Sequence, residues 1–228
     1  MREPIVLSWS GGKDSCLALA ALQADPDLDV VGLLTSVTRG YDRISIHGVR
    51  RTLLEAQARA VRLPLHQIII EPHCTNADYE AAFRAGAEQL RARYPTLGRL
   101  AFGDLFLRDV REYRERLVAS VGFTAHFPLW GLDTGALAER FVALGYRARL
   151  VCVDTMQVAS SFAGRSFDSA LLAELPESAD PCGERGEFHT FVSDGPMFAE
   201  PVPYQIGEVV MREERFAYCD LVEAMNRP

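Results

Sequence analysis

The stretch from Ile5 to Leu22, IVLSWSGGKDSCLALAAL, constrains the fold of this chain more than any other. An apolar run ends in a polar, glycine-containing turn and then resumes, which predicts a strand, a loop and a helix in that order. Glycine has no Cβ and tolerates positive φ, so Gly11 and Gly12 allow successive backbone N–H groups to turn inward around an anion. A helix that begins near Lys13 adds the N–H groups of its first turn. The stretch therefore predicts a phosphate-binding loop.

The loop differs from two common nucleotide-binding loops, because it contains neither the Walker A pattern GxxxxGK[ST] nor the dinucleotide fingerprint GxGxxG. The segment from Ser10 to Ser15, SGGKDS, instead resembles the SGGxDS signature of the PP-loop ATP pyrophosphatases. This resemblance implies that the loop binds the β and γ phosphates and that ATP is cleaved between its α and β phosphates, giving AMP and pyrophosphate. The alternative interpretation of the same residues is a tight turn between a strand and a helix.

Strands and helices are expected to alternate through residues 1–130. The segment Asp29–Val37, DVVGLLTSV, is a nearly continuous apolar run, which is typical of a parallel strand buried on both faces. Further along we expect a helix over residues 49–63, a strand over 65–70, a helix over 77–93 capped by Asn76, a strand over 99–103, a helix over 109–121 and a strand over 123–127. This order predicts an α/β fold with a doubly wound parallel sheet, whose ligands bind beyond the carboxyl ends of its strands.

The alternation ends near residues 128–133, where we place a domain boundary. Residues 1–130 are expected to form a PP-loop ATP-binding domain, and residues 131–228 a smaller C-terminal α+β substrate domain. In the second domain we expect a helix over residues 135–144, a small helix over 169–175 and antiparallel strands within 208–219.

Composition narrows the functional class. The five cysteines are scattered without a CxxC pair, which argues against a zinc site and fits a reducing cytoplasm. No signal peptide precedes the first strand, and no apolar run reaches the roughly 20 residues of a membrane span, so we expect a cytoplasmic protein without membrane contact. The formal net charge is -7 with no block of lysines or arginines, so a nucleic-acid partner is not expected.

A second polar constellation spans Asp180–Phe198, DPCGERGEFHTFVSDGPMF. Its glycines allow sharp turns that present Glu184 and Glu187, and if residues 188–192 are extended, Glu187 and His189 share one face of a strand. A carboxylate beside an imidazole suits acid–base chemistry or the binding of ammonium. The alternative interpretation is a solvated hairpin with its turn at residues 194–196, and the residues alone do not decide between the two.

Four segments together resemble the diphthine–ammonia ligase family. They are SGGKDS at residues 10–15, SIHGVR at 45–50 with LEAQA at 54–58, the strand end at Gly103 and Asp104 with Arg108 and Asp109, and CGERGEFHTF at 182–191. The match spans almost the whole chain, and its last motif is the most specific. The diphthamide enzymes carry a glutamate where this chain has His189, a variant associated with the bacterial-type branch. The resemblance therefore implies ATP-dependent amidation of a carboxylate by ammonia, and it leaves the identity of that carboxylate open.

The resemblance also implies roles for individual residues. ATP and magnesium are the implied cofactors, with Asp14 as the metal ligand. The expected nucleotide-binding residues are Ser10, Gly11, Gly12, Lys13, Asp14, Ser15, Leu34, Thr35, Ser36, Gly103 and Asp104. The expected catalytic residues are Lys13, Asp104, Glu184, Glu187 and His189. The expected binding residues for the acceptor are His47, Arg50, Arg108, Glu184, Glu187, His189 and Thr190.

Two other functional classes remain open at this point. One is a PP-loop tRNA-modifying enzyme, against which the acidic balance and the isolated cysteines count. The other is a non-catalytic adenine-nucleotide-binding protein, which has no need of the second motif. The sequence does not specify the oligomeric state, and a homodimer stays open as well.

Overall fold

The computed structural model describes residues 2–41, 43–44 and 48–224. Its contacts divide the chain into two compact units, each made of more than one segment. The N-terminal unit comprises Met1–Ser10, Asp14–Ser45 and Leu63–Gly131. The C-terminal unit comprises Gly11–Lys13, Ile46–Arg62 and Leu132–Pro228. Residues 11–13 of the loop are thus grouped with a unit formed mostly by the last part of the chain.

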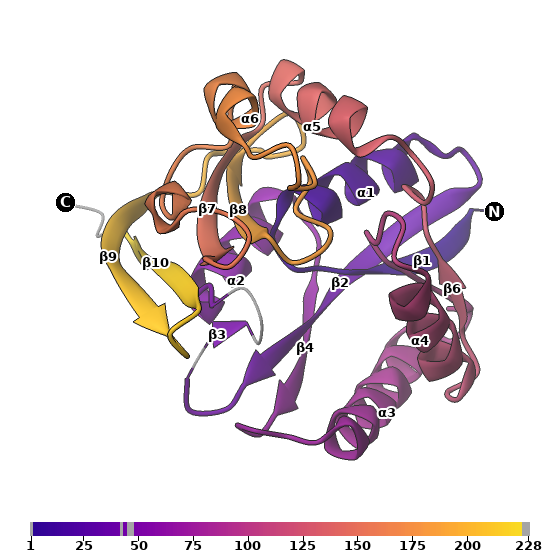
Figure 1. The fold of residues 1–228 in the computed structure, drawn as a ribbon. Coiled ribbons are helices and arrows are strands. Elements are labelled where there is room, and N and C mark those ends of the chain that lie inside the picture. The colour runs from indigo at the N-terminus through magenta and orange to yellow at the C-terminus, as the bar shows by residue number, and fades with distance from the viewer. Residues whose placement is uncertain (1, 42, 45–47, 225–228) are drawn as a thin grey trace. The chain divides into compact units, whose positions relative to one another are not determined.

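The N-terminal unit is built on a parallel sheet (Figure 1). Its strands are β1 (Glu3–Ser8), β2 (Leu28–Thr38), β3 (Arg43–Ile44), β4 (Leu65–Ile70), β5 (Arg99–Ala101) and β6 (Thr124–His126). Among the described strands, five pair in parallel in the order β4-β2-β1-β5-β6, and the short β3 pairs antiparallel with the end of β2. The chain first adds strands on one side of β1 and then, from β5 on, on the other side. This confirms the predicted doubly wound sheet and puts its topological switch point between β1 and β5.

Helices cover both faces of this sheet. Helices α3 (Asn76–Arg93) and α4 (Arg108–Ala119) lie on one face, and α1 (Lys13–Ala24) lies on the other (Figure 1). Alternation along β1 explains the two layers, because Val6 joins the buried cluster of α3 and α4 whereas Ile5 and Leu7 point to the opposite face. All three side chains are fully buried, as expected for a strand in the middle of a parallel sheet.

Several expected helix boundaries differ from the structure by one to three residues, and two of the differences have a clear physical reason. The prediction of Asn76 as an N-cap is wrong, because α3 begins at Asn76 and Thr75 is the cap. The Asp78 N–H donates to Thr75 Oγ1, and the Thr75 N–H donates to the Asp78 carboxylate, which together form a capping box. Helix α2 (Arg51–Ala60) is shorter than the expected span over 49–63, since Arg62 has a φ of 58° that a right-handed helix cannot continue.

The C-terminal unit contains an antiparallel sheet and short helices. Its strands β7 (Arg147–Asp154), β8 (Phe188–Asp194), β9 (Tyr204–Arg212) and β10 (Phe216–Glu223) follow the order β8-β7-β10-β9. It also holds α2, α5 (Thr134–Ala143), the 3₁₀ helix η1 (Ser160–Phe162) and α6 (Ser169–Glu174). This confirms the predicted smaller α+β part with antiparallel strands near its end. In the described part of the chain, no helix is long and apolar enough to cross a membrane.

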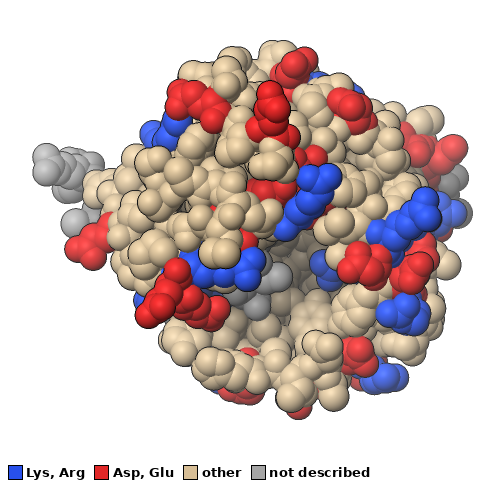
Figure 2. Space-filling model, viewed as in Figure 1, with Lys and Arg blue, Asp and Glu red and all other residues tan. Residues whose placement is uncertain are grey.

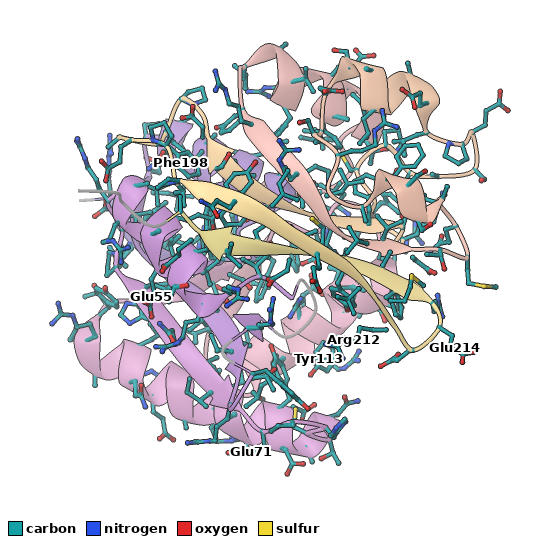
Figure 3. All side chains as sticks on the ribbon, turned by 90° about the vertical axis from the view of Figure 1, so that its left-hand side faces the viewer. Glu55, Glu71, Tyr113, Phe198, Arg212 and Glu214 are labelled. Carbon is teal, nitrogen blue, oxygen red and sulfur yellow. The ribbon has the colours of Figure 1, made fainter. Side chains whose placement is uncertain are left out.

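The β9–β10 hairpin ends in a strained turn, at the end where Figure 3 labels Arg212 and Glu214. Glu213 and Glu214 have φ angles of 51° and 53°, and the Arg215 N–H donates to the Arg212 carbonyl at 3.0 Å. Positive φ at both central positions defines a type I′ turn, which normally takes glycine or asparagine. The turn is fixed to β7, because the Arg215 guanidinium donates hydrogen bonds of 2.6 and 3.0 Å to the buried Asp154 carboxylate.

We predict that Glu214→Gly raises the free energy of unfolding by about 0.5 to 1 kcal/mol, because glycine adopts positive φ without a clash of its Cβ. This gain exceeds the extra entropy that glycine gives the unfolded chain, and urea titration measures the difference. Glu200→Gly is the matched control, since Glu200 is exposed and has no positive φ. Unchanged or lower stability of Glu214→Gly would contradict the prediction.

Candidate functional site

The first part of the candidate site lies at the switch point of the N-terminal unit, where the first turn of α1 approaches the chain after β5. A Cβ added to Gly103 would lie 3.1 Å from the Asp14 carbonyl carbon and 3.3 Å from the Ser15 nitrogen, so a side chain there would press on this turn. Ser10 Oγ donates to Ser15 Oγ at 3.3 Å, and Ser15 is buried. The structure thus brings Ser10, Asp14, Ser15 and Gly103 together from two of the expected nucleotide-binding segments.

Asp104 follows Gly103 at the same edge of the sheet. Burial raises the pKa of its carboxyl group, and the Arg114 guanidinium, with Nε 3.8 Å from Oδ2, only partly offsets this effect. The Arg114 charge therefore only partly compensates the negative charge of ionised Asp104. A cation that bound beside it would lower the pKa again.

Three of the expected nucleotide-binding residues, at positions 34–36, lie on β2. Leu34 and Thr35 are buried, and Ser36 is half-buried. The Leu34 side chain belongs to the hydrophobic core cluster of this unit. Of the three residues, only Thr35 and Ser36 therefore offer polar side chains to a ligand.

In the C-terminal unit, strand β8 holds the glycine–lysine part of the loop. The Val192 N–H donates to the Gly11 carbonyl at 2.9 Å, and the Lys13 N–H donates to Thr190 Oγ1 at 3.0 Å. Thr190 thereby satisfies one of the backbone donors that the first turn of α1 leaves without a helical partner. The Lys13 ammonium donates to the carbonyl of Cys182, which stands at the start of the second motif. These contacts join the two motifs that the sequence singled out.

Gln57 of α2 locks this arrangement, although the sequence analysis assigned it no role in the site. Its side chain is fully buried, and Nε2 donates to the carbonyls of Gly11 at 2.9 Å and Val192 at 2.5 Å. Gly11 has a φ of 76°, and a Cβ there would lie 2.4 Å from Gln57 Oε1, so the two residues fit together only with glycine at position 11. The signal in the sequence was a glutamine on the helical face that carries Leu53 and Leu54.

Lys13 is the only lysine in the sequence of 228 residues, and just 2% of its surface is exposed. Its ammonium lies 5.5 Å from the centroid of the Phe188 ring and 5.8 Å from that of the Phe167 ring. Two aromatic rings and a backbone carbonyl stabilise a cation that burial would otherwise disfavour. The ammonium therefore faces the second motif within the C-terminal unit, and its contact with phosphate stays a prediction.

Asp180 organises the turn that precedes β8. Its carboxylate accepts hydrogen bonds from the N–H groups of Cys182 and Glu184, at 2.9 and 3.2 Å, and from the Thr134 hydroxyl at 2.7 Å. Gly183 has a φ of 68°, and a Cβ there would lie 2.8 Å from a backbone oxygen of β8. The sequence analysis included Asp180 in the second constellation but gave it no role, and the structure shows it as the centre of this turn.

Glu187, the second glutamate of the motif, is fully buried. Its Oε1 accepts a hydrogen bond from the Asp180 N–H at 2.8 Å, whereas Oε2 has no hydrogen-bond partner among the described residues. Leaving a buried acceptor unsatisfied costs on the order of 1–3 kcal/mol. This atom is therefore the clearest place in the unit for an external N–H or O–H donor. The other glutamate, Glu184, is half-buried.

His189 carries a neutral imidazole at physiological pH. Burial lowers its pKa to about 4, and the Lys13 ammonium adds to the shift. An imidazole with this pKa is a weak base, so it accepts a hydrogen bond more readily than a proton.

The remaining residues that were expected to bind the acceptor have different surroundings. Arg50 donates hydrogen bonds of 2.6 and 3.2 Å to the Asp220 carboxylate of β10, so its guanidinium is tied to the C-terminal sheet. Arg108 is the exposed first residue of α4, in the N-terminal unit. His47 lies outside the described residues.

The side chains near the expected metal ligand, Asp14, are compatible with a magnesium ion only if a nucleotide supplies most of its ligands. Across residues 2–41, 43–44 and 48–224, no group of three or more histidine, cysteine, aspartate or glutamate side chains is placed to hold a metal ion. Asp14, the expected ligand, lies in the first turn of α1. Magnesium in phosphate-transfer sites commonly uses one or two carboxylates, with phosphates and water as its other ligands. One carboxylate beside the predicted phosphate loop is compatible with that pattern.

The pKa of His189 predicts a specific acid sensitivity. The pKa of His189 is 6.5 in the unfolded chain and about 4 in the folded protein, so the unfolded chain binds more protons between these pH values. The contribution of His189 to the free energy of unfolding is complete above about pH 6.5 and is lost as the pH falls toward about 4. The free energy of unfolding, measured with urea across this pH range, should depend less on pH in His189→Gln than in the wild type. His73→Gln, at an exposed position, should leave the pH dependence unchanged. An NMR titration that placed the His189 pKa near 6.5 would contradict this account.

Comparison with known proteins connects both motifs with one family. The diphthamide synthase N-terminal domain matches residues 2–125, and the diphthamide synthase C-terminal domain matches residues 133–222. The diphthine–ammonia ligase of Schizosaccharomyces pombe is 26% identical over 227 residues. That alignment covers 88% of this chain and 36% of the relative, so the chain spans about a third of the length of that protein. Because the first domain match alone covers more than half of the chain and the second includes the GERGEFHTF motif, the chain belongs to the diphthamide synthase family.

Proposed function

We propose that this chain is an ATP-dependent carbon–nitrogen ligase, which activates a carboxylate acceptor by adenylation and joins ammonia to it. The observation that carries the proposal is the set of hydrogen bonds from the loop residues Gly11 and Lys13 to the second motif and its strand. A phosphate loop that is fastened to a carboxylate-rich motif suits an enzyme that couples ATP cleavage to a second substrate. The name of the S. pombe relative, a ligase that uses ammonia, supports the same reaction class.

The loop is proposed to bind the phosphates of ATP through backbone N–H groups and the hydroxyl groups of Ser10 and Ser15. Gly11 and Gly103 support this role, because a Cβ at either position would crowd the loop or the first turn of α1. Magnesium, when bound, supplies positive charge on the phosphates, with Asp14 as its protein ligand. Asp104, whose negative charge is only partly compensated, is proposed to face that positive charge.

Amidation explains why ATP would be cleaved at its α-phosphate. A carboxylate resists attack by ammonia, because it is anionic and its oxygen is a poor leaving group. Transfer of AMP to the carboxylate converts that oxygen into part of a good leaving group and releases pyrophosphate. The largest catalytic contribution is then positive charge where the pyrophosphate develops its negative charge. We assign this role to the loop N–H groups, with the Lys13 charge behind them.

Glu187 and His189 are proposed to bind ammonium. Its proton passes to Glu187 or to solvent, and the resulting ammonia attacks the acyl adenylate and displaces AMP. Glu187 Oε2 is a buried acceptor without a donor among the described residues, and an ammonium ion has only donors to offer. His189 adds an acceptor that carries no charge at physiological pH. Glu184 and Thr190, which lie on either side of this pair in the sequence, are proposed to contact the acceptor.

The acceptor is proposed to be a small molecule or a protein side chain and not a nucleic acid. The net charge is -7, and on the face drawn in Figure 2 acidic and basic side chains are interspersed. Nucleic-acid binding relies on a concentrated basic surface. The name of the S. pombe relative includes diphthine, but this chain spans only 36% of that protein. The proposal therefore covers the reaction class and leaves the acceptor open.

We predict that incubation with ATP, magnesium, ammonium and a pool of carboxylate metabolites yields AMP and pyrophosphate. A loop that holds pyrophosphate leaves the α-phosphate as the electrophile, whereas a Walker A loop organises attack at the γ-phosphate. Chromatographic separation of the nucleotides identifies the product, and mass spectrometry of the pool detects acids that become amides. ADP as the main product would reject the mechanism. AMP without any amide would retain adenylation and reject ammonia as the second substrate for that pool.

Glu187→Gln should leave ATP binding nearly unchanged and lower amide formation by about a hundredfold or more. Glutamine keeps an oxygen that accepts from the Asp180 N–H, but its NH₂ group replaces the anionic oxygen proposed to bind ammonium. Calorimetry with ATP and an amide assay measure the two effects. Glu177→Gln, at an exposed position before the motif, is the matched control. Loss of folding or of ATP binding in Glu187→Gln would assign this residue to the scaffold.

A further inference from the structure

Strand β9 is an exposed edge of the C-terminal sheet. Among the described strands it pairs with β10 alone. Residues 205–212 are all exposed, and they include four large apolar side chains, Ile206, Val209, Val210 and Met211. The opposite edge strand, β8, is covered, because it bonds to the Gly11 carbonyl and the Val202 N–H. A long apolar edge that is left open is a template for another strand.

The buried face of the sheet continues onto β9. Val209 and Met211 lie directly opposite Cys219 and Ala217 of β10, and directly opposed residues share one face of a sheet. Cys219 and Ala217 are 3% and 0% exposed, whereas Val209 and Met211 are 52% and 48% exposed. The apolar face therefore ends on β9 as uncovered surface.

Two irregularities delimit the part of β9 that is available for pairing. Ile206 lies opposite Leu221 and Val209 opposite Cys219, so β9 contains one extra residue, a bulge, just before Val209. At the other end, the strained turn starts at Glu213. Residues 207 and 208 together lie opposite Asp220 and form this bulge. The segment from the second bulge residue to the turn, EVVMR at residues 208–212, has Val210 at its midpoint.

We propose that β9 pairs with β9 of a second copy of this chain, antiparallel and centred on Val210. In this register Val209 lies opposite Met211 of the other copy on the apolar face. Glu208 lies opposite Arg212 of the other copy on the other face. Symmetry makes both pairs occur twice, whereas Val210 meets its own copy once on the two-fold axis. A two-fold symmetric interface requires this kind of self-complementarity.

The neighbouring registers lose the ion pairs. A centre on Val209 places Glu208 opposite Val210, and a centre on Met211 places Glu208 opposite Glu214. Shifting one strand by a single residue relative to the other turns its apolar side chains to the wrong face of the sheet. Charge and apolar pattern therefore agree on one register.

The test is self-association of the full chain, measured by analytical ultracentrifugation over a dilution series. The wild-type protein should form a dimer that dissociates on dilution. Glu208→Arg and Arg212→Glu each place like charges opposite one another twice and should weaken the dimer about tenfold. The double variant restores opposite charges and should restore the wild-type affinity. Glu139→Arg, at an exposed position on α5, changes the net charge by the same amount as Glu208→Arg and should leave association unchanged.

These substitutions lie at exposed positions, so unchanged thermal unfolding midpoints show that each variant is folded. A wild-type protein that stays monomeric over the whole series would overturn the proposal. A dimer that ignores the single charge reversals, or that the double reversal fails to restore, would place the interface elsewhere and overturn it as well.

Discussion

The hydrogen bonds to the Gly11 carbonyl are the constraint on which the loop depends. This oxygen accepts from the Val192 N–H and from Gln57 Nε2, which uses both of its lone pairs. In a trans peptide the C=O and the following N–H point in opposite directions. Fixing the Gly11 carbonyl toward β8 and α2 therefore aims the Gly12 N–H away from them. The orientation of the Gly11–Gly12 peptide, in the loop that we propose to bind phosphate, is thus set by residues far along the chain.

This dependence has a consequence for folding. The Lys13 N–H and Thr190 Oγ1 are separated by 177 positions in the sequence, and contacts of high sequence separation form late because loop closure opposes them. The strand and helix on either side of the loop are local elements. The loop itself acquires its hydrogen bonds only when β8 and α2 are in place. A fragment that ended before the second motif would contain SGGKDS without the partners that shape it.

The sequence predicted most of the scaffold, because the spacing of apolar residues along the chain shows which faces of each helix and strand are buried. Residues 65–70 were expected as a strand and form β4, and the βα alternation led to the doubly wound sheet. The N-cap of α3 was harder to predict, because Thr75 and Asn76 are adjacent and both suit an N-cap. The capping box with Asp78 decides for Thr75. In the site, the pattern pointed to Gly103 and Lys13. It missed Gln57, because a polar residue on an apolar helical face reveals its partners only in three dimensions.

The burial of Lys13 gives the protein a property that is independent of its activity. Of the 24 lysine and arginine residues, this is the single lysine, so apart from the terminal amine the chain offers amine-directed reagents one atom. That atom lies against Phe167, Phe188 and the Cys182 carbonyl. A reagent can reach it only when the loop separates from the second motif, and the labelling rate then follows the population of that opened state. The chain thus carries its own built-in probe of local opening at the place where its two motifs join.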